Sequence, residues 1–114
     1  MISFACKNVD LKDIITCSFD LNKTEYELLV FLIKQEEPLT ISEIADKTGF
    51  ERSTVQKAIS KLLLKEVVER RQLNLKGGGY RFIYQVEDKD AIKERMTRIV
   101  DGWHRNVLEA VKQW

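Results

Sequence analysis

The sequence predicts a mostly α-helical fold with one small β-hairpin (α+β class) and a long helix at its end. Three observations lead to this prediction: apolar residues three and four positions apart up to residue 65, alternation of apolar and polar residues over 67–86, and renewed helical spacing from residue 88. The 114 residues are 44% hydrophobic and 32% charged, enough to bury one core without disulfide bonds. We therefore expect one compact domain over residues 1–87, followed by a helix over 88–114.

The apolar segments are too short for a membrane protein. None approaches the ~18 consecutive apolar residues that a membrane span requires. The first residues, MISFACKNVDLKD, lack the basic start and long apolar segment of a secretory signal. The sequence thus predicts a cytoplasmic protein without membrane contact.

Helix-start signals divide the first third of the chain. A short helix is expected over Leu11–Cys17. Asn22 followed by Glu25 has the spacing of a capping box, in which each side chain accepts a hydrogen bond from the other residue's amide. The segment Tyr26–Lys34 is apolar nearly all round, and Pro38 follows it. We expect this helix to be buried on more than one side.

Two further helices flank a glycine turn. Ser42 is expected to cap a short helix over Glu43–Thr48, and Gly49 to end it in the left-handed conformation. The next helix is expected over Arg52–Lys65. Its inward stripe is Val55, Ala58, Ile59 and Leu62. Two helices joined by a short turn with glycine predict a helix-turn-helix unit.

Residues 67–86 predict two strands joined by a glycine-rich tip. Leu73 and Leu75 alternate with polar residues in the first strand. In the second strand the alternating apolar residues are Tyr80, Phe82, Tyr84 and Val86. The run Gly77–Gly79 between them resembles a nucleotide phosphate loop only superficially, because that loop leads into a helix and carries a Lys-Ser/Thr pair. A basic hairpin directly after the second helix of a helix-turn-helix predicts a winged helix.

The charge distribution is uneven although the net charge is only +1. Residues 51–81 contain eight Lys or Arg and three Asp or Glu, giving 8 − 3 = +5, and the remainder carries 11 − 15 = −4. A basic segment in an otherwise acidic chain is typical of a surface that meets a polyanion.

The expected DNA-binding residues lie on the polar side of the second helix and on the hairpin. Recognition helices present such side chains to base edges and phosphates in the major groove. The candidates are Arg52, Ser53, Thr54, Gln56, Lys57, Ser60, Lys61, Lys76, Gly78, Tyr80 and Arg81. The alternative is an ordinary solvated helix face. Leu64 projects to the same polar side, and we expect it to pack under the hairpin or against the long helix.

Apolar residues along 88–114 predict a helix of about 25 residues, with Gly102 marking a bend. They are Ile92, Met96, Ile99, Trp103, Val107, Val111 and Trp114. Their spacing is not a strict heptad, so we expect helix pairing rather than an extended coiled coil. The seven residues are interpreted as a homodimer interface that would set two recognition helices about 34 Å apart. The alternative is a helix folded back over its own domain.

The residues that could carry catalysis or bind metals are few. Cys6, Cys17 and the single His104 do not make a structural zinc site, which takes four ligands. Buried or idle thiols are the simpler interpretation, and a redox-sensing pair is the alternative. One histidine and no nucleophile–base spacing predict that the protein is not an enzyme, and the sequence indicates no cofactor and no metal.

The segment LNKTEYELLVFLIKQEEPLTISEIADKTGFERSTVQKAISKLLLKEVVERR resembles the winged helix-turn-helix domain of MarR-like and TrmB-like transcription regulators. Within it, RSTVQKAISKLLLKE is similar to their recognition helix, and GGGYRFIY to their wing. The tail AIKERMTRIVDGWHRNVLEAVKQW resembles the C-terminal dimerisation helix of short archaeal members.

This resemblance implies a homodimeric regulator that binds double-stranded DNA. It places Arg52, Ser53, Thr54, Gln56 and Lys57 in the major groove and Arg81 on the DNA backbone or in the minor groove. Longer TrmB-like proteins carry an effector domain for which this chain has no room, so the resemblance does not imply sugar sensing. The sequence leaves open a small-molecule or redox effector, the operator, and the choice between repression and activation.

A function of another class is also compatible with a winged helix. Such domains serve as protein–protein interaction modules in transcription and repair machinery. That role does not require the second helix and the hairpin both to be basic, which favours the DNA-binding interpretation.

Overall fold

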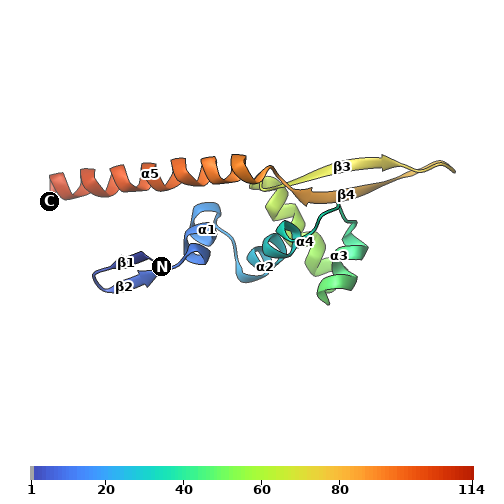
Figure 1. Ribbon diagram of the computed structural model, residues 1–114, viewed down its shortest axis with the longest axis horizontal. Helices are drawn as coiled ribbons and strands as arrows, with labels where there is room; N and C mark the ends of the chain where they lie inside the picture. Colours follow the sequence, from blue (N-terminus) through green and yellow to red (C-terminus); the bar gives the residue numbers. More distant parts are fainter. Residues whose placement is uncertain (1) are drawn as a thin grey trace. The chain divides into compact units, whose positions relative to one another are not determined.

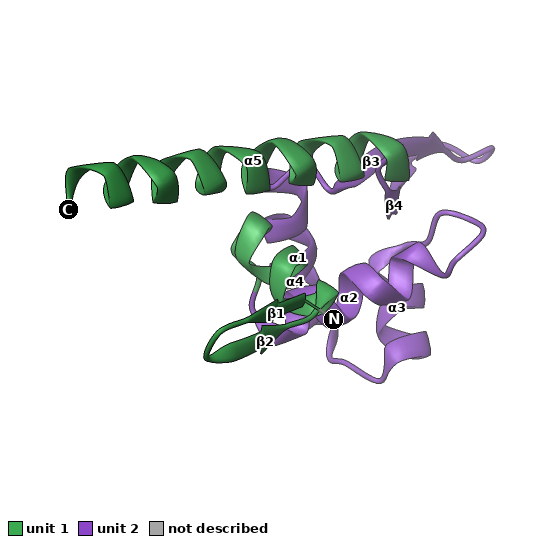
Figure 2. Ribbon diagram, turned by 60° about the vertical axis from the view of Figure 1, so that its left-hand side comes forward, with its two compact units in different colours: residues 1–21, 88–114 green, residues 22–87 purple. Residues whose placement is uncertain are grey.

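The computed structural model describes residues 2–114, which form five helices and two antiparallel hairpins (Figure 1). In chain order the elements are β1 (Ile2–Phe4), β2 (Lys7–Val9), α1 (Leu11–Phe19), α2 (Lys23–Ile33), α3 (Ile41–Thr48), α4 (Arg52–Leu64), β3 (Val68–Asn74), β4 (Tyr80–Val86) and α5 (Lys89–Gln113). They divide into two compact units, residues 22–87 and residues 1–21 with 88–114 (Figure 2). The fold class predicted from the sequence is confirmed. The assignment of residues 1–87 to DNA binding concerns function and stays a prediction.

The unit of residues 22–87 begins with the predicted capping box. The Asn22 side chain accepts a hydrogen bond from the Glu25 amide at 2.8 Å, and the Glu25 carboxylate accepts one from the Asn22 amide at 3.1 Å. Both partners of this box therefore satisfy amides that the first turn of a helix leaves without intrahelical acceptors.

The start of α3 differs from the prediction. Thr40, not Ser42, is the cap: its hydroxyl accepts from the Glu43 amide at 3.1 Å, and the Glu43 carboxylate accepts from the Thr40 amide at 3.0 Å. Thr40 lies three residues before Glu43, which is the capping-box spacing, whereas Ser42 falls inside the first turn. The prediction overlooked that spacing.

The turn between α3 and α4 is confirmed. Gly49 has φ of +82° and its amide donates to the Ala45 carbonyl at 2.9 Å, so α3 ends in a left-handed cap. After the two residues Phe50 and Glu51, α4 begins at Arg52.

The core of this unit joins all three helices to the hairpin. Its buried side chains are Leu28, Leu29, Leu32, Leu39, Ile44, Ala45, Val55, Ala58, Ile59, Leu62, Val67, Val68 and Tyr84. They include the four positions of the α4 stripe predicted from the sequence. Because one face of α4 is fully committed to this core, its opposite face is held toward solvent.

Strands β3 and β4 form the wing, which is anchored at its base. Leu39 and Tyr84 exchange backbone hydrogen bonds at 2.9 and 2.8 Å, and Tyr84 is buried. The register pairs Leu73 with Arg81 and Gln72 with Phe82, so the apolar positions of the two strands lie on opposite faces of the ribbon. Towards the tip the ribbon projects beyond the helices, and both faces are exposed (Figure 1).

The other unit contains a hairpin that the sequence analysis did not predict. Strands β1 and β2 pair with Ile2 opposite Val9, and they are joined by the turn Ala5–Cys6. Asp10 follows directly and caps α1, accepting from the Asp13 amide at 3.0 Å. Each strand has only three residues, too few for the alternation of apolar and polar positions to stand out.

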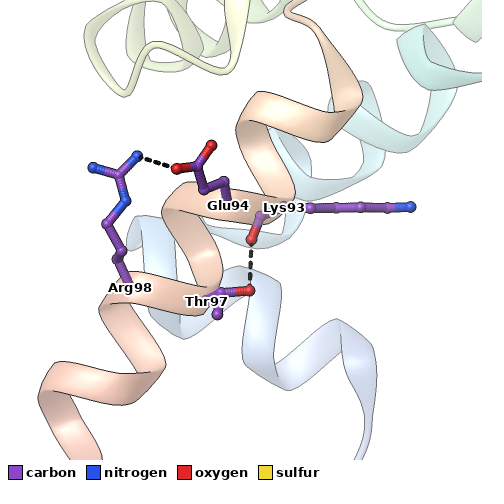
Figure 3. Close-up of polar contacts among 4 residues, drawn as sticks. All are labelled: Lys93, Glu94, Thr97 and Arg98. Atoms are coloured by element: carbon purple, nitrogen blue, oxygen red, sulfur yellow. Dashed lines mark hydrogen bonds and ion pairs between the residues drawn. The ribbon is translucent and has the colours of Figure 1, made fainter.

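Helix α5 runs without a break through Gly102, so the predicted bend is absent. Its polar side is laced by pairs one turn apart: the Arg98 guanidinium lies 3.3 Å from the Glu94 carboxylate, and the Thr97 hydroxyl donates to the Lys93 carbonyl at 2.9 Å (Figure 3). None of its residues is buried. Among residues 2–114, no helix is both long and apolar enough to cross a membrane.

Candidate nucleic-acid interface

The outward face of α4 is basic and free of carboxylates. Six of the seven predicted α4 residues are exposed: Arg52, Ser53, Gln56, Lys57, Ser60 and Lys61. Thr54 is half-buried. No Asp or Glu occurs anywhere in Arg52–Leu64. The helix therefore presents cations and hydroxyls, without an acid that would repel a phosphate.

The start of α4 is open. Glu51 occupies the cap position but makes no side-chain hydrogen bond to the first turn, in contrast to the caps of α1, α2 and α3. Amides of a first helical turn that lack a side-chain cap point outward with partial positive charge, and can donate to an anion. Arg52 and Ser53 stand beside these amides.

A shallow groove of about 530 Å³ lies along the polar side of α4. Its lining combines the start of α2 with seven residues of α4: Asn22, Thr24, Glu25, Thr54, Gln56, Lys57, Ala58, Ser60, Lys61 and Leu64. Leu64 is 77% exposed, so the expectation that it packs under the wing is wrong. The groove thus has an apolar end at Leu64 and two lysines along its wall.

Two of the predicted polar residues are tied to each other. The Ser60 hydroxyl donates to the Gln56 carbonyl at 2.9 Å, and the Gln56 side-chain amide approaches the Ser60 oxygen at 3.5 Å. The Ser60 hydroxyl therefore donates its only proton within the helix, and its oxygen can only accept a hydrogen bond from a ligand. Gln56 keeps its carbonyl oxygen and one amide proton for a ligand.

One face of the wing carries an aromatic and cationic cluster. The Arg70 guanidinium lies 4.2 Å from the centre of the Phe82 ring, and the Tyr80 ring meets Phe82 edge-on at 5.4 Å. Tyr80 is 58% exposed. The cation–π contact holds the Arg70 side chain along the ribbon. Sequence reasoning missed Arg70, although its place opposite Tyr84 follows once the hairpin register is known.

The opposite face carries Arg81 beside Leu73. Arg81 also acts on Glu43 of α3. The Thr40 hydrogen bonds hold the pKa of Glu43 below its ordinary value, and the charge of Arg81 lowers that pKa further. Arg71 donates to Gln85 at 3.4 Å on the same side of the ribbon. Tyr80 and Arg81, although adjacent in sequence, therefore serve different faces.

The tip of the wing contains the other two predicted residues, Lys76 and Gly78. The Gly78 amide donates to the Leu75 carbonyl at 3.2 Å, and Gly78 and Gly79 have φ of +94° and +81°. The glycines therefore shape the turn as predicted. Lys76 is exposed. The tip is separated from α4 by the length of the ribbon (Figure 1), so the α4 and tip residues form two patches rather than one pocket.

The seven residues predicted for the dimer interface differ in exposure. Ile92 and Met96 are half-buried, and Met96 lines a groove with Ile14 of α1. The other five are exposed: Ile99, Trp103, Val107, Val111 and Trp114. Sequence reasoning omitted two further exposed residues, Val100 and Leu108. Val100 and Leu108 are separated by two steps of four residues, so they lie on one side of the helix beside the predicted line.

Cys6 and Cys17 are free thiols at the surface, so they are not buried, and the choice between idle thiols and a redox-sensing pair stays a prediction. Cys6 lies in the turn of the β1–β2 hairpin and Cys17 on α1. Over residues 2–114 no cluster of three or more His, Cys, Asp or Glu side chains could hold a metal ion.

Comparison with known proteins places this geometry in a family. The family model described as "Sugar-specific transcriptional regulator TrmB" matches residues 16–90. The Methanocaldococcus jannaschii protein MJ1082 is 31% identical over 108 residues, 95% of this chain and 85% of that protein.

Solved structures agree on the fold. A possible transcriptional regulator from Methanosarcina mazei superposes with a TM-score of 0.88 at 31% identity, covering 100% of this chain and 96% of that one. A Staphylococcus aureus MepR variant bound to an oligodeoxyribonucleotide has a TM-score of 0.56 at 21% identity, over 86% of this chain and 71% of that one. At that identity the MepR structure supports the winged-helix fold alone.

Proposed function

Because the chain belongs to the TrmB family of transcriptional regulators, we propose that it is a sequence-specific regulator that binds double-stranded DNA as a homodimer. In this proposal α4 enters the major groove and the β3–β4 wing contacts the backbone or the minor groove. The observation that supports it best is the outward face of α4, which is basic, free of carboxylates and open at its N-terminus.

The proposal gives different roles to residues along α4. Ser53, Gln56 and Lys57 are near the start of the helix, where recognition helices meet base edges, so they read bases. Arg52 and the open amides of the first turn bind a phosphate. Thr54 faces the major groove with Gln56 and Lys57. Ser60 and Lys61 lie about one turn further along and contact the DNA backbone.

The wing contributes affinity more than sequence discrimination. Arg81 and Lys76 bind phosphates, and the Gly78 backbone allows close approach of the DNA strand. Tyr80 and Arg70 belong to the other face, where the cation–π contact orients the guanidinium before DNA arrives. A cation held in place loses less side-chain entropy on binding.

The homodimer forms through the exposed apolar line of α5, from Ile99 to Trp114. A helix that exposes two tryptophans and buries none of its residues lacks a sufficient partner within its own chain. Pairing two copies would cover this line and set the two α4 helices on one side of a DNA duplex, as a palindromic operator requires.

Binding measured against salt tests the proposal. Fragments of the source genome that bind to the immobilised protein are first selected. The protein is then titrated into a fluorescent duplex of such a fragment at several salt concentrations. We expect the logarithm of affinity to fall linearly with the logarithm of salt concentration, because phosphate contacts release counterions. Absent binding at low salt, or a flat salt dependence, would refute the proposal and favour a protein–protein module instead.

A further inference from the structure

Exposed apolar side chains are concentrated in one of the two units. Fifteen large hydrophobic residues are exposed among residues 2–114. Ten of them belong to residues 1–21 and 88–114: Ile2, Phe4, Leu11, Ile99, Val100, Trp103, Val107, Leu108, Val111 and Trp114. At typical side-chain areas they present on the order of 1,000 Å², comparable to the ~800 Å² that each partner contributes to a standard interface.

The β1–β2 hairpin is part of this surface and has two unlike faces. Its register places Ile2, Phe4 and Val9 on one face, together with Lys7 opposite Phe4. On the other face the Ser3 hydroxyl donates to the Asn8 side chain at 3.0 Å. Ile2 is 56% and Phe4 71% exposed. A two-stranded hairpin is at best marginally stable in water, so this one requires something to cover its apolar face.

Helix α5 presents a second apolar line beside the one assigned to helix pairing. This line, the flank, consists of Val100, His104, Leu108 and Val111, spaced four, four and three residues apart, and it shares Val111 with the pairing line. Ile14 of α1 lines an open groove with Val100 and His104, so α1 lies beside the start of the flank, where Val100 is still 40% exposed. Leu108 and Val111 lie beyond it and are 50% and 64% exposed.

The hairpin and the open end of the flank do not cover each other within one chain, since both remain exposed. Val9 is followed immediately by the Asp10 cap, so the hairpin is fixed to the start of α1 without a linker. Figures 1 and 2 both show the hairpin and the second half of α5 extending in the same direction from α1, apart from each other. Within the unit of residues 1–21 and 88–114, each surface is therefore left for a contact from outside the unit.

We propose that the hairpin of one protomer packs its Ile2, Phe4 and Val9 face onto Leu108 and Val111 of the partner's α5. Two-fold symmetry repeats the contact, so each hairpin covers the other chain's flank. This inference rests on the homodimer proposed above and adds to it a second contact. The hairpin is then a clamp that secures the pairing of the α5 helices.

Cys6 provides a test of this contact, because it is exposed in the hairpin turn. In a Cys17→Ser variant, Cys6 is labelled with a benzophenone maleimide. Protomers at natural isotope abundance are mixed with ¹⁵N-labelled protomers, and the mixed dimers are irradiated and digested. We expect cross-links from the hairpin of one isotope to the peptide containing Leu108 and Val111 of the other. Cross-links confined to one isotope would overturn the inference, because the hairpin would then cover its own helix.

Dimer dissociation measured by sedimentation separates this inference from the homodimer itself. Phe4→Ser should raise the dimer dissociation constant at least about tenfold, and Ser3→Ala on the opposite hairpin face should change it less than about twofold. An unchanged constant for Phe4→Ser would overturn the clamp and leave the homodimer standing. A monomeric wild-type protein would overturn both.

Discussion

The two units of this protein bury their apolar residues to very different degrees. Residues 22–87 form a core in which Leu28, Ile44, Val55, Ile59 and Leu62 are fully buried. In the other unit α5 buries no residue, although it is the longest helix that the structure describes. One unit can stabilise itself, and the other has apolar surface that only a further contact would cover.

The two units also differ in the charges that their surfaces expose. The unit of residues 22–87 exposes the basic face of α4 and the wing, and the Glu51 position before α4 provides no side-chain cap. The second exposes ion pairs one turn apart along α5, including Glu94 with Arg98, which are worth only a few tenths of a kcal/mol each. The unit of residues 22–87 thus carries an uncompensated basic face, whereas α5 carries acidic and basic residues together, two pairs of which form ion pairs.

Truncating one apolar residue in each unit should give the largest contrast. Ile59→Ala removes a fully buried side chain and should lower the free energy of unfolding by about 2–5 kcal/mol. Trp103→Ala removes a side chain that is 63% exposed and should lower monomer stability by less than about 0.5 kcal/mol. Denaturant unfolding at low protein concentration measures both. Equal losses would contradict the distinction between the units.

Changing the exposed basic residues should weaken DNA binding without changing stability. Lys57→Ala should cost about 1–3 kcal/mol with the preferred operator and little with unrelated duplexes, because it is proposed to read bases. Arg81→Ala should weaken all duplexes alike and flatten the salt dependence, as expected for a phosphate contact. Fluorescence anisotropy with matched and scrambled duplexes distinguishes them. A neutral Arg81→Ala would remove the wing from the proposed contact surface.

Local signals in the sequence were sufficient to predict most of the unit of residues 22–87. The Asn22 box, the Gly49 turn and the α4 stripe each depend on residues within one or two turns, and all are confirmed. Thr40 was missed although its signal was present three residues before Glu43. For the candidate DNA-binding site, the exposure of α4 followed from the stripe, but the roles of its residues stay predictions.

The features that could not be predicted depend on contacts distant in sequence. The faces of the wing required the register between β3 and β4, which places Arg70 near Phe82 across twelve residues. The β1–β2 hairpin has strands too short for a periodic signal. The exposure of Leu64 was misjudged because a helical spacing indicates where a residue points, not whether anything lies there.

Replacing either of two glycines by alanine should change the free energy of unfolding by a smaller amount, and in opposite directions. Gly49 has φ of +82° and no atom within 4 Å of an added Cβ, so Gly49→Ala should cost about 1–2 kcal/mol from backbone conformation alone. Gly102 lies inside α5 with no positive φ and equal space, so Gly102→Ala should favour the helix by about 0.5–1 kcal/mol. Thermal unfolding followed by circular dichroism measures each. A stabilising Gly49→Ala would mean that the left-handed cap is not required.

The helix caps provide the smallest expected effect and test where α3 begins. Thr40→Ala should lower the free energy of unfolding by about 1 kcal/mol, whereas Ser42→Ala should change it by less than about 0.5 kcal/mol. The same loss from both variants would contradict the assignment of Thr40 as the cap.

The difference in unfolding free energy between wild type and Thr40→Ala should depend on pH through Glu43. The Thr40 hydrogen bonds depress the pKa of Glu43 in the folded protein below its ordinary value near 4.5. A depressed pKa contributes stability above the unfolded-state value, and this contribution is lost as the pH falls through the folded-state value. Thr40→Ala removes the hydroxyl contribution to this depression but keeps the backbone amide, which is its largest cause. The gap between wild type and Thr40→Ala should therefore narrow only slightly below about pH 4.5. Because Glu43 is exposed, the change should be a fraction of the cap energy, and a gap that widens in acid would show that Glu43 does not complete the box.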